Sequence, residues 1–205
     1  MQNEICAGIV LYNPDMARLR ENIKAIINQV DIVFLQDNGS ANISEVEELM
    51  GELPKAILLK SSQNKGIAWA LNRLCERATH NNYRWILTLD QDSVCPEGMI
   101  GAYCKYLDNA DILCPKIVDR NYGVLDGDSA EVTPVKKCIT SGCLLKLDSW
   151  KRLNGFDEAM FIDGVDFEFC YRMMKCGMKI LRVNGVELNH EIGNITVRHF
   201  LGWKV

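Results

Sequence analysis

The stretch that decides the fold of this chain is residues 85–92, Trp85-Ile86-Leu87-Thr88-Leu89-Asp90-Gln91-Asp92. Its apolar run predicts a buried strand, and the strand ends in two carboxylates separated by one residue. Because side chains alternate between the faces of a strand, Asp90 and Asp92 are expected to point the same way at its carboxyl end. Two hard oxygen ligands placed in this way favour Mg²⁺ or Mn²⁺, with phosphate oxygens of a substrate filling the open positions.

The same residues also allow a purely structural interpretation. Asp90-Gln91-Asp92 could begin a loop, with Asp92 or Ser93 capping a helix after Pro96. The spacing of the two carboxylates does not by itself decide between a metal site and a loop.

The bulk composition describes a globular protein. Apolar residues make up 48% of the 205 residues, which is enough for a core, and we expect one folded unit. The formal net charge of −4 gives no overall attraction to nucleic acid or anionic lipid. The first apolar run, residues 5–11, is too short to span a membrane and follows no basic segment. It therefore predicts a strand and not a signal peptide.

The chain has nine cysteines, an odd number, and no Cys-x-x-Cys or Cys/His spacing that suits zinc. We interpret them as small buried hydrophobic residues of a protein in the reducing cytoplasm. This interpretation rests on those in apolar runs or helical patterns, namely Cys6, Cys75, Cys104, Cys114, Cys143, Cys170 and Cys176.

Short apolar runs alternate with helical patterns in the first half, as in βαβ units on a mostly parallel sheet. The expected strands are residues 5–11, 32–36, 56–60 and 84–89. Ligands of such sheets bind beyond the carboxyl ends of the strands. The segments found there are Tyr12-Asn13, Asp37-Asn38-Gly39-Ser40, Gln63-Asn64-Lys65-Gly66 and Asp90-Gln91-Asp92. Each could be an ordinary turn, but four in register favour a site.

Three helices are expected between these strands. Asn13-Pro14 predicts a cap for the first, and Ser44-x-x-Glu47 reads as a capping box that opens the second. The third has a buried stripe that runs from Ile67 to Ala78. Neither a Walker loop nor Gly-x-Gly-x-x-Gly is present in the sequence, so the common phosphate-binding loops of hydrolases and dehydrogenases are missing.

The second half has a different pattern. Residues 119–137 predict a surface excursion or a short hairpin, and residues 138–147 a strand with a close backbone approach at Ser141-Gly142. Residues 179–183 predict a short strand, followed by Glu187-Leu188-Asn189-His190. A lone histidine is more often structural, so His190 becomes a metal ligand only if the fold brings it to Asp92.

Residues 161–172 predict a loop that enters a helix ending near Gly177. Asp163 and Asp166 fall at the start of that helix, where the macrodipole favours their charged forms. The alternative for both aspartates is simple helix capping. Glu168 and Arg172 are four residues apart and are expected to pair.

Together these motifs resemble the family 2 glycosyltransferases of the GT-A fold, and among them the rhamnosyltransferase-like branch. The nucleotide-binding half is matched by Val10-Leu11-Tyr12-Asn13-Pro14, Asp37-Asn38-Gly39-Ser40, Asn64-Lys65-Gly66-Ile67-Ala68 and Ala70-Leu71-Asn72. The family's metal-binding D-x-D element resembles Thr88-Leu89-Asp90-Gln91-Asp92-Ser93. The F-I-D-x-V-D-x-E segment of the rhamnosyltransferase branch resembles Phe161-Ile162-Asp163-Gly164-Val165-Asp166-Phe167-Glu168. The metal-binding histidine that the family carries late in its sequence resembles His190-Glu191-Ile192-Gly193. The similarity spans residues 5 to about 195.

The resemblance implies a doubly wound, mostly parallel α/β sheet with helices on both faces and a smaller acceptor-side subregion. Residues 1–205 would be one GT-A domain, with a nucleotide-sugar half at 1–95 and an acceptor and catalytic half at 96–205. Relatives commonly continue through a further helical stretch, so we expect either that the chain is truncated at its C-terminus or that the acceptor-side cover is missing.

The resemblance also implies roles for named residues in an inverting, metal-dependent transferase. Asp166 would be the catalytic base; Val165 replaces the family's usual Glu beside it, which leaves Asp163 as a second candidate. Asp90, Asp92 and His190 would hold Mg²⁺ or Mn²⁺. The nucleotide sugar would be bound by Tyr12, Asn13, Asp37, Asn38, Asn64, Lys65, Gly66, Asp90 and Gln91.

The implied donor is a dTDP- or UDP-linked sugar, most simply dTDP-L-rhamnose, and the implied acceptor is a glycan or lipid-linked glycan of the bacterial surface. We expect a cytoplasmic protein with at most peripheral membrane contact and no nucleic-acid partner. Two alternatives stay open from the residues alone. A nucleotidyltransferase would need a Gly-rich basic loop where Tyr12-Asn13-Pro14 stands, and a non-catalytic Mg²⁺-binding signalling module would need neither Asp166 nor His190.

Overall fold

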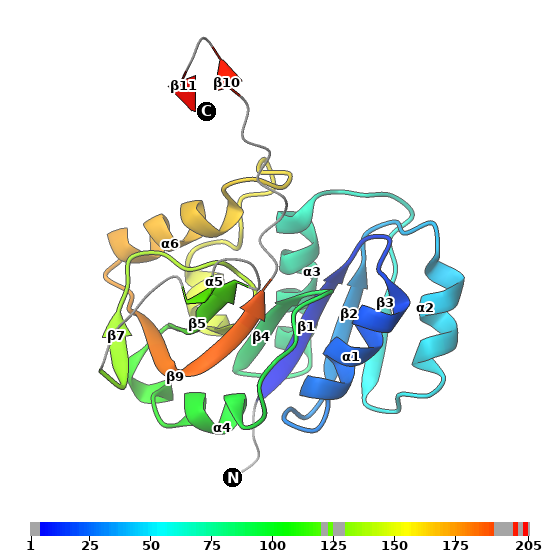
Figure 1. Ribbon diagram of the computed structural model, residues 1–205, viewed down its shortest axis with the longest axis horizontal. Coiled ribbons are helices and arrows are strands. Elements are labelled where there is room, and N and C mark those ends of the chain that lie inside the picture. The colour runs from blue at the N-terminus through cyan, green and yellow to red at the C-terminus, as the bar shows by residue number, and fades with distance from the viewer. Residues whose placement is uncertain (1–4, 120–122, 125–129, 191–198, 201–202, 205) are drawn as a thin grey trace.

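The structure is a computed structural model that describes residues 5–119, 123–124, 130–190, 199–200 and 203–204 (Figure 1). Its centre is a nine-stranded sheet with the strand order β3-β2-β1-β4-β8-β5-β9-β7, and β6 pairs with β5 at one side. A separate antiparallel pair is formed by β10 (His199–Phe200) and β11 (Trp203–Lys204). Among helices within the described residues, none is both long enough and apolar enough to cross a membrane.

The first four strands are parallel, as the sequence predicts. They are β1 (Ile5–Leu11), β2 (Val33–Asp37), β3 (Ala56–Leu59) and β4 (Trp85–Asp90). The helices α1 (Met16–Ile26), α2 (Ile43–Met50) and α3 (Ile67–His80) connect them. All four predicted strands are confirmed, and their ends differ from the prediction by at most one residue. Their carboxyl ends therefore meet at one edge of the sheet.

The second half continues the same sheet with strands of both directions. These elements are α4 (Met99–Cys104), the 3₁₀ turn η1 (Leu107–Asn109), β5 (Ile112–Asp119), β6 (Gly123–Val124), β7 (Val132–Pro134), β8 (Cys143–Lys146), α5 (Leu147–Arg152), α6 (Val165–Lys175) and β9 (Ile180–His190). β8 is antiparallel to both β4 and β5, whereas β9 is parallel to β5. The carboxyl ends of β5 and β9 thus share the edge reached by β4.

Helices cover both faces of the sheet, which confirms the doubly wound α/β class (Figure 1). Alternate residues of β1 bury their side chains in opposite layers, as a strand requires. Ile5, Ala7 and Ile9 pack with α1, α2 and α4, while Cys6 packs with α3, α5 and α6. Each layer contains residues from before and after position 95.

Two strands depart from the prediction for reasons that lie in their sequence. β5 was not predicted, because Pro115 interrupts its apolar run and proline lacks the donor that a central strand needs. The prediction ended the last strand at Val183, because Asn184-Gly185 resembles a turn. In the structure β9 continues to His190. In the structure the pairing skips from Pro115↔Val183 to Lys116↔Glu187, so the proline and the Asn-Gly pair face each other at one bulge. Because the register shift lies at Pro115 on β5 and at Asn184-Gly185 on β9, the two strands stay paired on either side of it.

Several predicted boundaries are wrong by a few residues. α1 is capped by Asp15, whose carboxylate accepts a hydrogen bond of 2.9 Å from the Arg18 N–H. α2 begins after Asn42, so Ser44 lies inside the first turn and no capping box opens the helix. In the second half, residues 138–142 precede β8, and only Cys143–Lys146 form the predicted strand. Residues 119–137 were expected to form a surface excursion or a short hairpin; the two short strands described there do not pair with each other, because β6 pairs with β5 and β7 with β9.

The cysteines are all free, as expected, but they are not all buried. Cys104 and Cys176 are exposed, and Cys138 is partly exposed. Both exposed thiols lie at helix ends, Cys104 as the last residue of α4 and Cys176 as the C-cap of α6. A position at the end of a helical pattern does not have to face the core, which is why the sequence interpretation failed at these two residues.

Candidate active site

The carboxyl ends of β1 and β4 are held together by the segments that follow them. The Tyr12 N–H donates to Gln91 Oε1 at 2.9 Å, and Gln91 Nε2 donates back to the Tyr12 carbonyl at 3.2 Å. Asn22 on α1 donates to the Asp90 carbonyl at 2.6 Å, and the Asp90 N–H donates to Ser141 Oγ at 3.0 Å. The backbone around the two predicted metal-binding aspartates is therefore fixed on both sides.

Asn38 connects the ends of β2 and β3. Its amide nitrogen donates to Asn64 Oδ1 at 2.9 Å and to the Gly66 carbonyl at 3.1 Å, and its oxygen accepts from the Lys65 N–H at 2.9 Å. Asn64 Oδ1 also accepts from the Gly66 N–H at 2.9 Å. These bonds use a buried side chain to set the loop that leads into α3.

Seven of the predicted site residues line one cleft of about 400 Å³ at this edge of the sheet: Tyr12, Asn38, Asn64, Gly66, Asp90, Gln91 and Asp92. The expectation that the four polar segments lie together is thereby confirmed. β4 ends at Asp90, so Asp92 reaches the cleft from the following turn and not by strand alternation. The helix α4 has Gly98 as its N-cap, so the alternative in which Asp92 or Ser93 caps it is wrong.

Three predicted nucleotide-binding residues make other contacts. Asp37 is buried, and its carboxylate accepts hydrogen bonds of 3.1 Å from the N–H groups of Gly39 and Ser40. The Asn13 oxygen accepts from the Ala41 N–H at 2.7 Å. Lys65 is exposed and places its ammonium 4.7 Å from the centre of the Trp69 ring. Asp37 and Asn13 therefore stabilise the loop after β2, which contributes Asn38 to the cleft.

The sequence reasoning missed four apolar residues of the cleft wall, Val10, Ile67, Phe161 and Ile162, of which the last two come from the loop before α6. These last two are more than half exposed. Their place is set by the Phe161 carbonyl, which accepts from the Ile67 N–H at the start of α3 at 2.7 Å. Exposed apolar residues just before Asp163 were the available signal, because such side chains commonly mark a binding surface.

Gly66 makes this contact possible. It has a φ of +89°, and a Cβ atom there would lie 2.6 Å from the Phe161 carbonyl oxygen. We expect Gly66→Ala to lower the free energy of unfolding by about 1–3 kcal/mol, through backbone strain and the clash. Gly101→Ala is the matched control, because Gly101 lies in α4 with open space around it and alanine should be neutral or stabilising there. Urea unfolding measures both; a Gly66→Ala protein as stable as wild type would show that the contact is not required.

Asp166 lies away from the cleft lining, in the first turn of α6. Its carboxylate accepts a hydrogen bond of 2.9 Å from the Phe167 N–H, and Gly164 is the N-cap. Burial raises the pKa of Asp166 above its usual value and outweighs the opposing effect of the hydrogen bonds. The expectation that the helix start favours its charged form is therefore wrong in its net effect. Asp163 is exposed in the loop before the helix.

The predicted pair Glu168–Arg172 is confirmed within α6, and Arg172 also connects this helix to the end of α5. Two hydrogen bonds of 2.5 and 2.6 Å join the guanidinium to the carboxylate, and Arg172 also donates to the Leu153 carbonyl at 2.6 Å. On α3, Asn72 accepts from the Phe156 N–H at 2.8 Å and donates to its carbonyl at 3.0 Å. These contacts position the loop that carries Phe161 and Asp163.

The third predicted metal ligand, His190, is the last residue of β9 and pairs with Asp119 of β5. This places its backbone at the same sheet edge as Asp90, while its side chain lies outside the described residues. Within the described part, no group of three or more His, Cys, Asp or Glu side chains is arranged to hold a metal ion. Two carboxylates on one cleft nevertheless fit a hard divalent cation that keeps positions open for phosphate oxygens.

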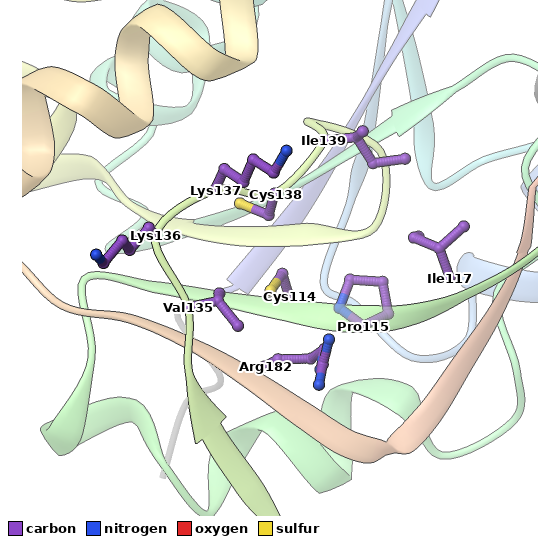
Figure 2. Close-up of a pocket in the computed structure, with 9 residues that line it drawn as sticks. All are labelled: Cys114, Pro115, Ile117, Val135, Lys136, Lys137, Cys138, Ile139 and Arg182. Carbon is purple, nitrogen blue, oxygen red and sulfur yellow. The ribbon is translucent and has the colours of Figure 1, made fainter. Parts of the chain in front are cut away.

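A second cavity of about 330 Å³ lies between β5, β9 and the segment before β8 (Figure 2). It is lined by Cys114, Pro115, Ile117, Val135, Lys136, Lys137, Cys138, Ile139 and Arg182, none of which was predicted to bind donor or metal. Its aliphatic and cationic walls carry no carboxylate that could hold a divalent cation. The cleft at the strand ends is thus the better candidate for a metal–diphosphate site.

Comparison with known proteins identifies the family and agrees with the fold. The sequence model of Glycosyl transferase family 2 matches residues 6–171, and the chain belongs to this family. A curated relative, the dTDP-rhamnosyl transferase RfbF of Shigella flexneri, is 27% identical over 220 residues, which cover 97% of this chain and 72% of that protein.

Two solved structures have the same fold. GalNAc-T7 with UDP, GalNAc and Mn²⁺ superposes with a TM-score of 0.75 at 15% identity, over 97% of this chain and 44% of that one. TarS of S. aureus, residues 1–349, gives a TM-score of 0.70 at 15% identity, over 89% and 59%. The chain thus spans about half the length of these structures. They confirm the predicted GT-A fold.

Proposed function

We propose that this glycosyltransferase is inverting and metal-dependent, and that it moves L-rhamnose from dTDP-rhamnose to a hydroxyl of a surface-polysaccharide or lipid-linked acceptor. The observation that carries the proposal is the cleft in which Asp90 and Asp92 lie with Tyr12, Asn38 and Gly66 in a family 2 chain. The rhamnosyl donor is supported by the Shigella relative, which is a dTDP-rhamnosyl transferase. A cation is supported by the Mn²⁺ in the GalNAc-T7 structure.

In this proposal the cleft binds the donor. Tyr12 and Asn38 contact the nucleoside, the Asn64–Gly66 loop faces the diphosphate, and Asp90 and Asp92, with His190, hold Mg²⁺ or Mn²⁺. The bound cation supplies positive charge that offsets the charge of the leaving nucleoside diphosphate. Phe161 and Ile162 form an apolar wall of the cleft.

Asp166 acts as the base that takes the proton from the acceptor hydroxyl as it attacks the anomeric carbon. Burial raises the pKa of this carboxylate, which makes its ionised form a better proton acceptor. A single displacement from the opposite face inverts the anomeric centre without a covalent intermediate. The match to Glycosyl transferase family 2 supports this mechanism over the nucleotidyltransferase and the signalling module.

The nucleotide preference tests the donor assignment. We expect dTDP to compete with the donor more strongly than UDP, and dTDP-rhamnose to be turned over in preference to UDP-glucose or UDP-N-acetylglucosamine. The measurement is release of nucleoside diphosphate from each sugar at equal concentration, with Mn²⁺ present. TarS binds UDP and UDP-N-acetylglucosamine on the same fold, so the fold itself accepts uridine. A clear preference for a UDP-sugar would contradict the rhamnosyl assignment.

We further propose that the protein works in the cytoplasm. Its contact with the inner face of the membrane would be at most peripheral and would come from a lipid-linked acceptor. The net charge of −4 gives no general attraction to anionic lipid. Flotation with liposomes is expected to recover little of the 205-residue chain on neutral lipid, and more when the vesicles contain a lipid diphosphate. Strong flotation on neutral lipid alone would contradict the peripheral assignment.

A further inference from the structure

Four thiols from different parts of the chain meet beside Asp166. Cys138 Sγ lies 3.5 Å from Cys143 Sγ on β8 and 3.7 Å from Cys170 Sγ on α6. The Cys138 thiol also contacts that of Cys114 on β5. Cys138, Cys143, Cys170 and Asp166 line one small cavity of about 20 Å³. The proposed mechanism uses none of these sulfur atoms, so their gathering needs a separate explanation.

Cys138 connects this cluster to solvent. It is partly exposed, whereas Cys143 and Cys170 are buried. Besides the small cavity it lines the cavity of about 330 Å³ that is drawn in Figure 2, where Cys114 and Cys138 come from β5 and from the segment before β8. Cys138 thus lines the larger cavity and, with Cys170, the small one, so the two contacting sulfur atoms lie where the cavities adjoin.

The contacts favour the Cys138–Cys170 pair as the reactive one. The Cys143 thiol is committed to the Ile139 carbonyl, to which it donates at 2.8 Å. The pKa of Cys170 is lowered, chiefly by its hydrogen bond with the Cys138 thiol. Thiolates are the nucleophilic form of cysteine. The described residues contain no metal-binding group of three or more such side chains, so the cluster is not arranged as a metal centre.

We propose that Cys138 and Cys170 form a site of reversible oxidation, at which hydrogen peroxide closes a disulfide between the segment before β8 and α6. The Cys170 thiolate attacks one peroxide oxygen and breaks the O–O bond, which gives a sulfenic acid and hydroxide. The hydroxide takes the proton of Cys138 and becomes water. The Cys138 thiolate then attacks the sulfenic sulfur and expels hydroxide, so two electrons pass from the two sulfurs to the peroxide.

The disulfide would displace segments that carry or contact residues of the proposed active site. Its sulfur atoms must approach from 3.7 Å to about 2.05 Å, so α6 or residues 138–142 must shift. Cys170 lies one turn after Asp166 on α6. Residues 138–142 contain Thr140, whose carbonyl accepts from the Thr88 hydroxyl at 2.6 Å, and Ser141, which accepts from the Asp90 N–H. Either shift would disturb the geometry of transfer, and this consequence rests on the proposed function.

Peptide mapping tests the site without an activity assay. The reduced 205-residue protein is treated with graded hydrogen peroxide, alkylated, digested without reductant and examined by mass spectrometry. We expect linked peptides that contain Cys138 and Cys170, and their loss after dithiothreitol. Cys138→Ser should abolish the link, with Cys138→Ala as a second variant, while Cys143→Ser and the exposed control Cys104→Ser should retain it. Links confined to other cysteines, sulfinic acid without any link, or stoichiometric zinc in the isolated protein would overturn the proposal.

Turnover of the nucleotide sugar tests the consequence. The mapped disulfide form should turn over donor about tenfold more slowly or worse, because small displacements at reacting groups are costly. Dithiothreitol should restore the rate, and Cys138→Ser should resist peroxide with an unfolding temperature near that of wild type. Full turnover by the linked form would overturn the inhibitory effect. If no form of the protein turns over donor, the proposed function fails, whereas the mapped link still decides the oxidation site.

Discussion

Asp166→Asn is expected to bind the donor as tightly as wild type and to transfer sugar about 10²–10⁴-fold more slowly, the usual range for a positioned general base. The amide keeps the shape of the side chain but cannot accept the proton of the acceptor hydroxyl. Asp166 does not line the cleft that is proposed to hold the nucleotide, so donor affinity should not change. Calorimetry with dTDP and an assay of nucleoside diphosphate release in the presence of acceptor separate the two effects.

Asp163→Asn is the matched control, because Asp163 is exposed three residues before Asp166. It should keep most of the activity. An inactive Asp163→Asn together with an active Asp166→Asn would exchange the two roles and leave the base in the loop before α6.

The raised pKa of Asp166 adds a signature in pH and stability. The rate of transfer should fall with decreasing pH at a higher pH than an ordinary aspartate would give, because the base must be ionised. The raised pKa also means that the folded state holds this proton more tightly than the unfolded state, so the contribution of Asp166 to stability falls as pH rises through that pKa. Above that pKa the asparagine replaces a charge that burial disfavours, so the unfolding temperature of Asp166→Asn should equal or exceed that of wild type there.

Asp92→Ala is expected to remove the metal-dependent part of diphosphate binding, at least about 10–100-fold in affinity, since even indirect supports of a metal site cost that much. Asp92 is exposed at the cleft and lies in the turn after β4, so its removal should leave the fold intact. Calorimetry with dTDP, with and without Mn²⁺, measures the difference.

The matched control for this variant is Asp108→Ala, which removes an exposed carboxylate in η1, outside the residues that line the cleft. It should bind dTDP and Mn²⁺ as wild type does. Unchanged Mn²⁺-dependent affinity in Asp92→Ala would show that the cation is held elsewhere.

The regular part of the fold follows from local sequence, and the irregular part does not. The strands β1–β4 are mainly apolar and contain neither proline nor an Asn-Gly pair, so their prediction succeeds within one residue. β5 and β9 contain Pro115 and Asn184-Gly185, which locally oppose a strand. Their pairing at a shared bulge depends on two segments that are distant in sequence. No local pattern contains that information.

The site divides in a similar way. The rule that ligands bind at strand carboxyl ends brings Tyr12, Asn38 and Asp92 to one cleft, as expected. The sequence could not show that the Asp37 carboxylate is occupied by its own turn. The sequence also could not predict the cluster of thiols around Cys138, because these cysteines come from segments that are adjacent only in the folded protein.

The central claim is that the cleft at the strand ends binds a nucleoside diphosphate together with a divalent cation. The most direct test is a crystal structure of the chain grown with dTDP and Mn²⁺. We predict the diphosphate between the Asn64–Gly66 loop and Asp92, with anomalous density for Mn²⁺ at the Asp90 and Asp92 carboxylates. Nucleotide bound instead in the cavity of Cys114 and Arg182, or bound in the cleft with no cation at either aspartate, would contradict the account.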